Sequence, residues 1–298
     1  DFDYDWRARG LAIFANLDSL WETVPLPIGV ATRVVWSDLP YIRPLTDVID
    51  RFGAFNVALV NRESVRVFSV RMGEIQAQTE ALGEELKRHR QGGWSAQIYQ
   101  RREDNLAIQN LKQAAEVLLA FSEQTGVRRL VLGGSPEVLA QFREVMPREL
   151  SEQILGEFTA DVSASAHKAL QLSLDVVYQA DLEKERRLVE EAITAARKGA
   201  NGALGVADTI YALYQGRVRT LLINASFHGE AYVCDVCGSV STAPLPECPL
   251  CGHTEVRHVA DVANLAVHKA IETGAAIEIV RDSAELAECG GMAAILRY

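Results

Sequence analysis

The spacing of apolar and polar residues divides the chain into short segments with strand period and longer segments with helix period. Alternating positions on both sides of a polar turn at 61–63 predict a hairpin of strands 56–60 and 65–70. Between 95 and 123 the period changes to that of one long helix, with apolar residues at Ile98, Ala107, Leu111, Ala114, Leu118 and Phe121.

The same pattern continues to both ends of the chain. The further segments of helix period are expected at 44–52, 136–146, 161–199, 206–213 and 262–272. Further strands are expected at 9–15, 31–36, 218–223 and 274–280, in 129–135 as a buried strand that ends in a turn, and in 290–298 as a turn and a final strand. Residues 72–91 are polar and give no strong strand signal. Helices alternate with strands in both halves, which predicts an α/β fold of two α/β sandwich domains.

Length, charge and cysteine content narrow the class of protein. A chain of 298 residues is long for one core, which favours two domains. No run of 18 apolar residues occurs, so we expect no membrane span and no membrane partner. The net charge of −10 is opposite to that of a nucleic-acid-binding surface, so any contact with RNA needs a local basic patch. Four of the five cysteines form CxxC pairs, typical of metal binding in a reducing compartment, and we expect a cytoplasmic protein.

The cysteine pairs predict a metal site. Cys234 and Cys237 form one pair, Cys248 and Cys251 the other, and a glycine follows the second cysteine of each pair. Such a CxxCG segment forms a tight knuckle, because glycine tolerates positive φ. Four thiolates make a closed tetrahedral shell, so the pattern predicts one structural zinc ion per chain, in a zinc ribbon over 232–254. His228, His253 and His258 flank the pairs and are interpreted as solvated or packing residues.

A second segment combines glycines with positive charge. Residues 87–102 contain two central glycines, no acidic residue and the basic residues Lys87, Arg88, Arg90, Arg101 and Arg102. Cations around a glycine-rich tip, just before a helix, suit contact with phosphate groups. The alternative interpretation is a solvated glycine turn followed by a basic helix start.

This segment resembles the Gly-Gly-Gln loop of the class-1 peptide-chain release factors of archaea and eukaryotes. Gly92, Gly93, Ser95 and Ala96 match that loop. The chain end Gly290-Gly291-Met292-Ala293-Ala294-Ile295-Leu296-Arg297-Tyr298 is very close to the GGIAAILRY-type end of the family. Segments 9–14, 55–68, 130–136 and 205–213 resemble the family in the same order, and the CxxC pairs occupy the place of its archaeal zinc-ribbon insertion.

The resemblance implies a domain organisation. Residues 1–20 would be the remnant of a preceding N-terminal domain. Residues 21–160 would form the middle-type domain, with an RNase-H-like fold and the loop tip Gly92, Gly93, Trp94 and Ser95. Residues 161–298 would form the C-terminal-type α/β/α domain that carries the zinc ribbon.

Two departures from the family change the expected function. Trp94 stands where the family has its catalytic Gln, and an indole offers one N–H donor and no acceptor. Nothing in the chain resembles the stop-codon motif of the codon-reading domain. Both features point to the divergent bacterial and archaeal release-factor-like branch, which includes relatives of Pelota and of ribosome-hibernation factors.

The resemblance therefore implies a translation factor that binds the ribosomal A site, in rescue or hibernation. Its partners would be ribosomal RNA, the P-site tRNA and a translational GTPase, and no release-factor-type peptidyl-tRNA hydrolysis is expected. One alternative is an active peptidyl-tRNA hydrolase or tRNA-cleaving enzyme that holds water with loop backbone. The other is an adaptor that uses its zinc domain to bind a protein partner, which the acidic charge favours.

Overall fold

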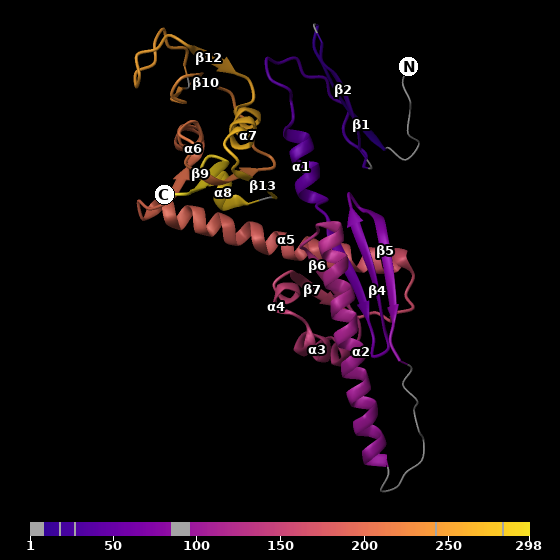
Figure 1. Ribbon diagram of the computed structural model, residues 1–298. Coiled ribbons are helices and arrows are strands. Elements are labelled where there is room, and N and C mark those ends of the chain that lie inside the picture. The colour runs from indigo at the N-terminus through magenta and orange to yellow at the C-terminus, as the bar shows by residue number, and fades with distance from the viewer. Residues whose placement is uncertain (1–8, 18, 27, 85–95, 242, 282) are drawn as a thin grey trace. The chain divides into compact units, whose positions relative to one another are not determined.

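The computed structural model describes residues 9–17, 19–26, 28–84, 96–241, 243–281 and 283–298. Contacts divide the chain into two compact units. Unit 1 combines residues 1–51 with residues 182–298, and unit 2 comprises residues 52–181 (Figure 1). These breaks differ from the expected boundaries at 20/21 and 160/161, which stay a prediction about domains of the family.

Unit 2 is built on a five-stranded sheet of order β5-β4-β3-β6-β7. Its strands are β3 (Phe55–Val60), β4 (Ser64–Arg71), β5 (Glu74–Leu82), β6 (Leu130–Gly133) and β7 (Ile154–Phe158). The first three pair antiparallel, and β6 and β7 then add parallel strands beside β3. All six residues of β3 are buried, as expected for the central strand of a sheet that is covered on both faces.

Helices cover both faces of this sheet. Helix α2 (Ala96–Thr125) and helix α3 (Pro136–Val145) pack on one face, through residues such as Leu111, Leu118 and Phe142. The first half of α5 (Ala166–Arg197) packs on the other through Ala169 and Val177, and the short α4 (Arg148–Ser151) precedes β7. The expected helix over 95–123 is confirmed, at Ala96–Thr125.

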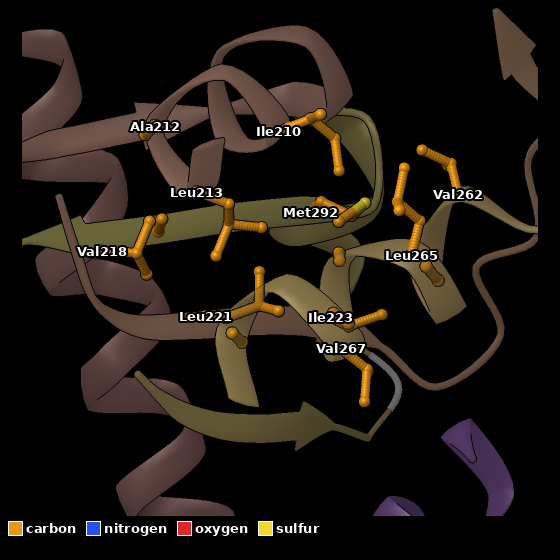
Figure 2. Close-up of a cluster of buried hydrophobic side chains, with 14 of the residues drawn as sticks. Ile210, Ala212, Leu213, Val218, Leu221, Ile223, Val262, Leu265, Val267 and Met292 are labelled. Atoms are coloured by element: carbon orange, nitrogen blue, oxygen red, sulfur yellow. The ribbon is translucent and has the colours of Figure 1, made fainter. Parts of the chain in front are cut away.

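Unit 1 is built on a four-stranded sheet of order β13-β9-β14-β8. Its strands are β8 (Gly202–Leu204), β9 (Val218–Asn224), β13 (Ala276–Val280) and β14 (Met292–Leu296). Helices α6 (Gly205–Tyr214) and α7 (Val262–Glu272) cover one face, and Figure 2 shows how Ile210, Leu213, Leu221, Val267 and Met292 pack there. The second half of α5 and helix α8 (Ala284–Glu288) cover the other face. Each unit thus has a sheet between two layers of helices, which confirms the mixed α/β class.

The N-terminal part of unit 1 contributes a hairpin and a helix. Strands β1 (Gly10–Ala15) and β2 (Trp21–Leu26) form a two-stranded antiparallel sheet. Helix α1 (Arg43–Arg51) begins where Asn264 Oδ1 accepts the backbone N–H groups of Ile42 and Arg43. Among the described residues, no helix is both long and apolar enough to cross a membrane.

Two expectations about strands are wrong. Residues 31–36 were expected as a strand because valines and Trp36 favour strands, but they pair with no other strand and Val34 and Trp36 are almost fully exposed. Conversely, the polar segment 74–82 forms the edge strand β5, because register with β4 outweighs low strand propensity. Strands β2 and β7 were also not expected.

Candidate metal centre

The two CxxCG segments fold into two knuckles of the same local geometry. The backbone N–H of Gly238 donates to the carbonyl of Cys234 at 2.9 Å, and that of Gly252 donates to the carbonyl of Cys248 at 2.9 Å. Both glycines have φ of +72°, in the left-handed region that side chains disfavour. The glycine after each pair is therefore required by the turn, as the sequence predicted.

A small three-stranded sheet holds the knuckles. Its order is β11-β10-β12, from β10 (Ala231–Cys234), β11 (Val240–Ser241) and β12 (Val256–Val259). Cys234 ends β10, so the first knuckle continues directly from a paired strand. The sheet spans residues 231–259, slightly more than the expected ribbon at 232–254.

The four sulfur atoms converge on one point. All four Sγ atoms lie within 4.8 Å of one another, and the Cys234–Cys251 and Cys237–Cys248 pairs are each 3.6 Å apart. The four cysteines form no disulfide. Sulfur atoms at these separations surround a space that suits a tetrahedral ion with metal–sulfur bonds of about 2.3 Å. The four residues can thus hold a metal ion, and they are the ones that the sequence predicted.

Backbone amides make the thiol of Cys248 easier to ionise, whereas burial makes that of Cys237 harder to ionise. Burial raises the pKa of Cys248, but N–H groups of Cys251 and Leu250 outweigh it and lower that pKa to about 6. Burial raises the pKa of Cys237 to about 12, against the opposing N–H of Ser239. A divalent cation at the centre would favour the thiolate at every position, because it supplies the opposite charge.

The first knuckle rests on helix α6. A Cβ at Gly238 would lie 2.5 Å from Cγ of Tyr214, so the glycine backbone packs directly on that ring. Lys269 of α7 places its Nζ 4.8 Å from the centre of the same ring. Burial, followed by the nearby Asp235, raises the pKa of Tyr214 to about 12, so the phenol stays neutral. Tyr214 was not predicted as part of the site. The apolar spacing of α6 predicts which side of the helix is buried, but not that the Gly238 knuckle packs on it.

Strand β12 supports the same knuckle with an ion pair. The single Nε–H of Arg257 is shared between the two carboxylate oxygens of Asp235, at 2.8 Å from each, and the backbone N–H of Asp235 donates to the carbonyl of Glu255. The charges of this pair cancel beside the thiols.

The flanking histidines make other contacts, as expected. His228 and His253 each lie near a backbone carbonyl, and His258 lies 3.2 Å from Glu230. All three are exposed, and none belongs to the four-residue group of possible metal ligands found among the described residues.

The loop residues of the sequence prediction are only partly described. Lys87, Arg88, Arg90 and the tip Gly92, Gly93, Trp94 and Ser95 lie outside the described residues. Arg101 and Arg102 are described, lie in the second turn of α2 and are both exposed. They are thus free to meet a partner near the start of that helix, while the proposed role of the tip stays a prediction.

Known proteins similar to this chain give its family relationship. Residues 40–176 match the model of Bacterial archaeo-eukaryotic release factor family 10. Peptide chain release factor subunit 1 of Thermococcus onnurineus is 24% identical over 332 residues, which cover 97% of this chain and 79% of the relative. The protein of the same name from Thermococcus kodakarensis is 25% identical over 331 residues, with the same shares covered. The chain is therefore a relative of the archaeal and eukaryotic release factors, as its loop and C-terminal motifs predicted.

The sequence identity to a solved structure is lower than to these relatives. The chain is 15% identical to an archaeal Pelota in a model of ribosome-bound Pelota and ABCE1, with 97% of this chain and 77% of that chain covered. The TM-score is 0.49.

Proposed function

We propose that this chain is a release-factor-like translation factor that binds the ribosomal A site, and that its four-cysteine centre holds structural zinc. The observation that carries the first part is the similarity to release factor subunit 1 along 97% of the chain. A similarity of that extent includes both sandwiches and the cysteine knuckles, so it supports a common fold over the whole chain and not over one domain alone.

The donor set favours zinc as the metal. Four cysteine thiolates with no carboxylate or imidazole among them suit a tetrahedral ion with soft-ligand affinity and no redox role. With four protein ligands the ion has no open position for water or substrate. Zinc would therefore stabilise the ribbon and take no part in a reaction.

Several finer assignments belong to the same proposal. Residues 21–160 would be the middle-type domain, and the strand order β5-β4-β3-β6-β7, with three antiparallel strands and two parallel ones, supports an RNase-H-like fold. Residues 161–298 would be the C-terminal-type domain. A rescue or hibernation role, cytoplasmic location, and contacts with ribosomal RNA, P-site tRNA and a translational GTPase follow from the family relationship.

Helix α2 supports the placement of the basic segment. Its N-terminus lies directly after the Gly-Gly-Trp tip in sequence, and its 30 residues make it about 45 Å long. Leu111 and Leu118 pack on the sheet of unit 2, whereas Arg101 and Arg102 near the N-terminus are exposed. The helix thus places Arg101 and Arg102, at the end of the basic segment, away from the part that is packed.

Cosedimentation with 70S ribosomes at low and high salt tests ribosome binding. Changing Arg88, Arg90, Arg101 and Arg102 together to Ala should weaken binding and reduce its log–log salt slope, by about 0.7–0.9 for each phosphate that the variant no longer neutralises. A matched variant changes four other arginines that are exposed in the structure: Arg148, Arg186, Arg187 and Arg197. It should bind as the unchanged protein does. Equal binding by both variants and the unchanged protein would favour the adaptor alternative.

Peptide release separates the factor from the hydrolase alternative. With Trp94 in place of Gln, we expect little or no peptidyl-tRNA hydrolysis on programmed ribosomes. Release at the rate of a true release factor, abolished by Trp94→Ala, would establish the hydrolase instead.

A further inference from the structure

Both segments through which the chain passes between its two units are fastened to one edge strand. The chain leaves unit 1 after Arg51 and returns to it at Leu182. Asp50 precedes the first passage, and Lys184 and Glu185 follow the second. All three side chains bind at the C-terminal end of β13, and every residue involved belongs to unit 1.

The second passage is held by charge pairs with buried carboxylates. Glu185, which is 2% exposed, accepts the backbone N–H of Arg281 at 2.7 Å and two hydrogen bonds from its guanidinium. Lys184 donates to the buried carboxylate of Glu278 at 2.5 Å. Charge-assisted bonds of this kind are about twice as strong as neutral ones, so α5 is firmly attached here.

The first passage is bonded to β13 through Asp50. Asp50, near the end of α1, accepts the backbone N–H of Ile279 at 3.1 Å. Within the described part of the chain, strand β13 lies at the edge of its sheet with β9 as its one neighbour, so Asp50 satisfies an amide that no described strand pairs. The other end of α1 is fixed separately, by Asn264 and Asp261 at Arg43.

We propose that the end of β13 is a clamp that joins the two passages, with a permanent attachment on α5 and a releasable attachment on α1. The clamp consists of Glu278, Ile279 and Arg281 with their partners Lys184, Glu185 and Asp50. When Asp50 leaves Ile279, the last turn of α1 is freed and one passage lengthens, while the α5 passage stays fixed.

Electrostatics indicate why the α1 side releases. Burial, followed by the nearby Glu278, raises the pKa of Asp50 to about 6, against the opposing effects of the Ile279 N–H and Lys184. Glu185 adds a smaller effect that also raises the pKa. Because the attached state has the higher pKa, attachment is strongest below the ordinary pKa of 3.8, weakens as pH rises from there to about 6, and stays weak above it. Near neutral pH, an ionised Asp50 thus lies beside another buried carboxylate.

Residue-resolved hydrogen exchange of the full chain tests the clamp. In the unchanged protein, the protection factor of the Ile279 amide should fall by about tenfold between pH 5 and pH 7.5. Asp50→Asn keeps an oxygen acceptor without charge, so it should abolish that pH effect and raise protection at pH 7.5. Asp50→Ala removes the acceptor and should lower protection at both pH values. Asp208→Asn, an exposed change on α6, is the matched control and should change nothing at Ile279.

A second experiment tests whether the attachments of α1 and α5 are coupled through β13. At pH 5, where Asp50 is mostly protonated and the charge of Glu185 acts little on it, Glu185→Gln should raise exchange at Ile279, although Glu185 does not bond that amide, while amides of α6 keep their protection. Glu190→Gln, an exposed change on the same helix, is its control. If Asp50→Asn leaves both the pH effect and the exchange at Ile279 unchanged, the releasable attachment is wrong. If Glu185→Gln raises exchange throughout unit 1 or nowhere, the two passages are not coupled through β13.

Discussion

The two cysteine knuckles have the same local structure and different surroundings. Each has its glycine at φ +72° and the same 2.9 Å hydrogen bond. The first continues from β10, packs on Tyr214 and has an ion pair beside it, whereas a Cβ at Gly252 of the second would meet nothing within 4 Å. The first knuckle thus joins the centre to the sandwich, whereas the second would be held mainly by the ion that the two knuckles are proposed to share. Loss of the ion should affect the second knuckle most.

Metal removal is the change with the largest expected effect. Structural zinc sites contribute about 10–16 kcal/mol of binding free energy, far more than the packing of the ribbon alone. Chelation should expose residues 231–259 to hydrogen exchange, most completely at Cys248–Gly252, while the sheet of unit 2 keeps its protection. Elemental analysis should find one zinc per chain in freshly reduced protein.

Either of two results would contradict this prediction. One is freshly reduced protein without stoichiometric metal. The other is equal loss of protection in both units after chelation, which would mean that the metal supports the whole chain and not one small sheet.

The two glycines allow a matched test of the comparison. Gly252→Ala should cost about 1–2 kcal/mol of unfolding free energy in the metal-loaded protein, from the left-handed φ alone. Gly238→Ala should cost about 1–3 kcal/mol more, because its Cβ would also overlap the Tyr214 ring. Urea unfolding of both variants measures the difference. Equal losses would show that the first knuckle does not rest on α6.

The sequence predicts the local structure of the knuckles but not the contacts between distant parts of the chain. The ligands and glycine turns follow from spacing alone, because a CxxCG knuckle is a local structure. The contact of Gly238 with Tyr214 joins residues 24 positions apart, and no periodicity in either segment reports it. The pairing of Asp50 with Ile279 is more distant still.

Strand prediction failed for a related reason. Residues 31–36 have strand-forming side chains without a strand to pair with, and β5 has a polar sequence with β4 beside it. Strand formation depends on a neighbour, which the local sequence does not contain. Helices α2 and α7, which satisfy their own hydrogen bonds, were predicted to within two residues.

Tyr214→Leu tests the ring itself. The change keeps an apolar side chain under Gly238 but removes the flat surface and the Lys269 interaction, which are together worth about 1–2 kcal/mol. Zinc affinity should fall by about tenfold, measured by competition with a chelator, because the apo ribbon loses its support on α6. Tyr232→Leu on β10 is a control within the ribbon. An equal effect of both changes would mean that any aromatic residue near the centre matters.

The ion pair of the first knuckle should have the smallest effect. Asp235 and Arg257 are about one-third exposed, and pairs of that exposure contribute about 0.2–1 kcal/mol. Asp235→Asn should therefore cost about 0.5 kcal/mol at low salt and less at high salt, since solvent ions screen the pair. In the second knuckle, Leu250 is exposed and has no charge, so Leu250→Ala should cost little and show no salt dependence. A salt-independent loss of 2 kcal/mol or more for Asp235→Asn would mean that its accepted hydrogen bonds, and not its charge, hold the knuckle to β12.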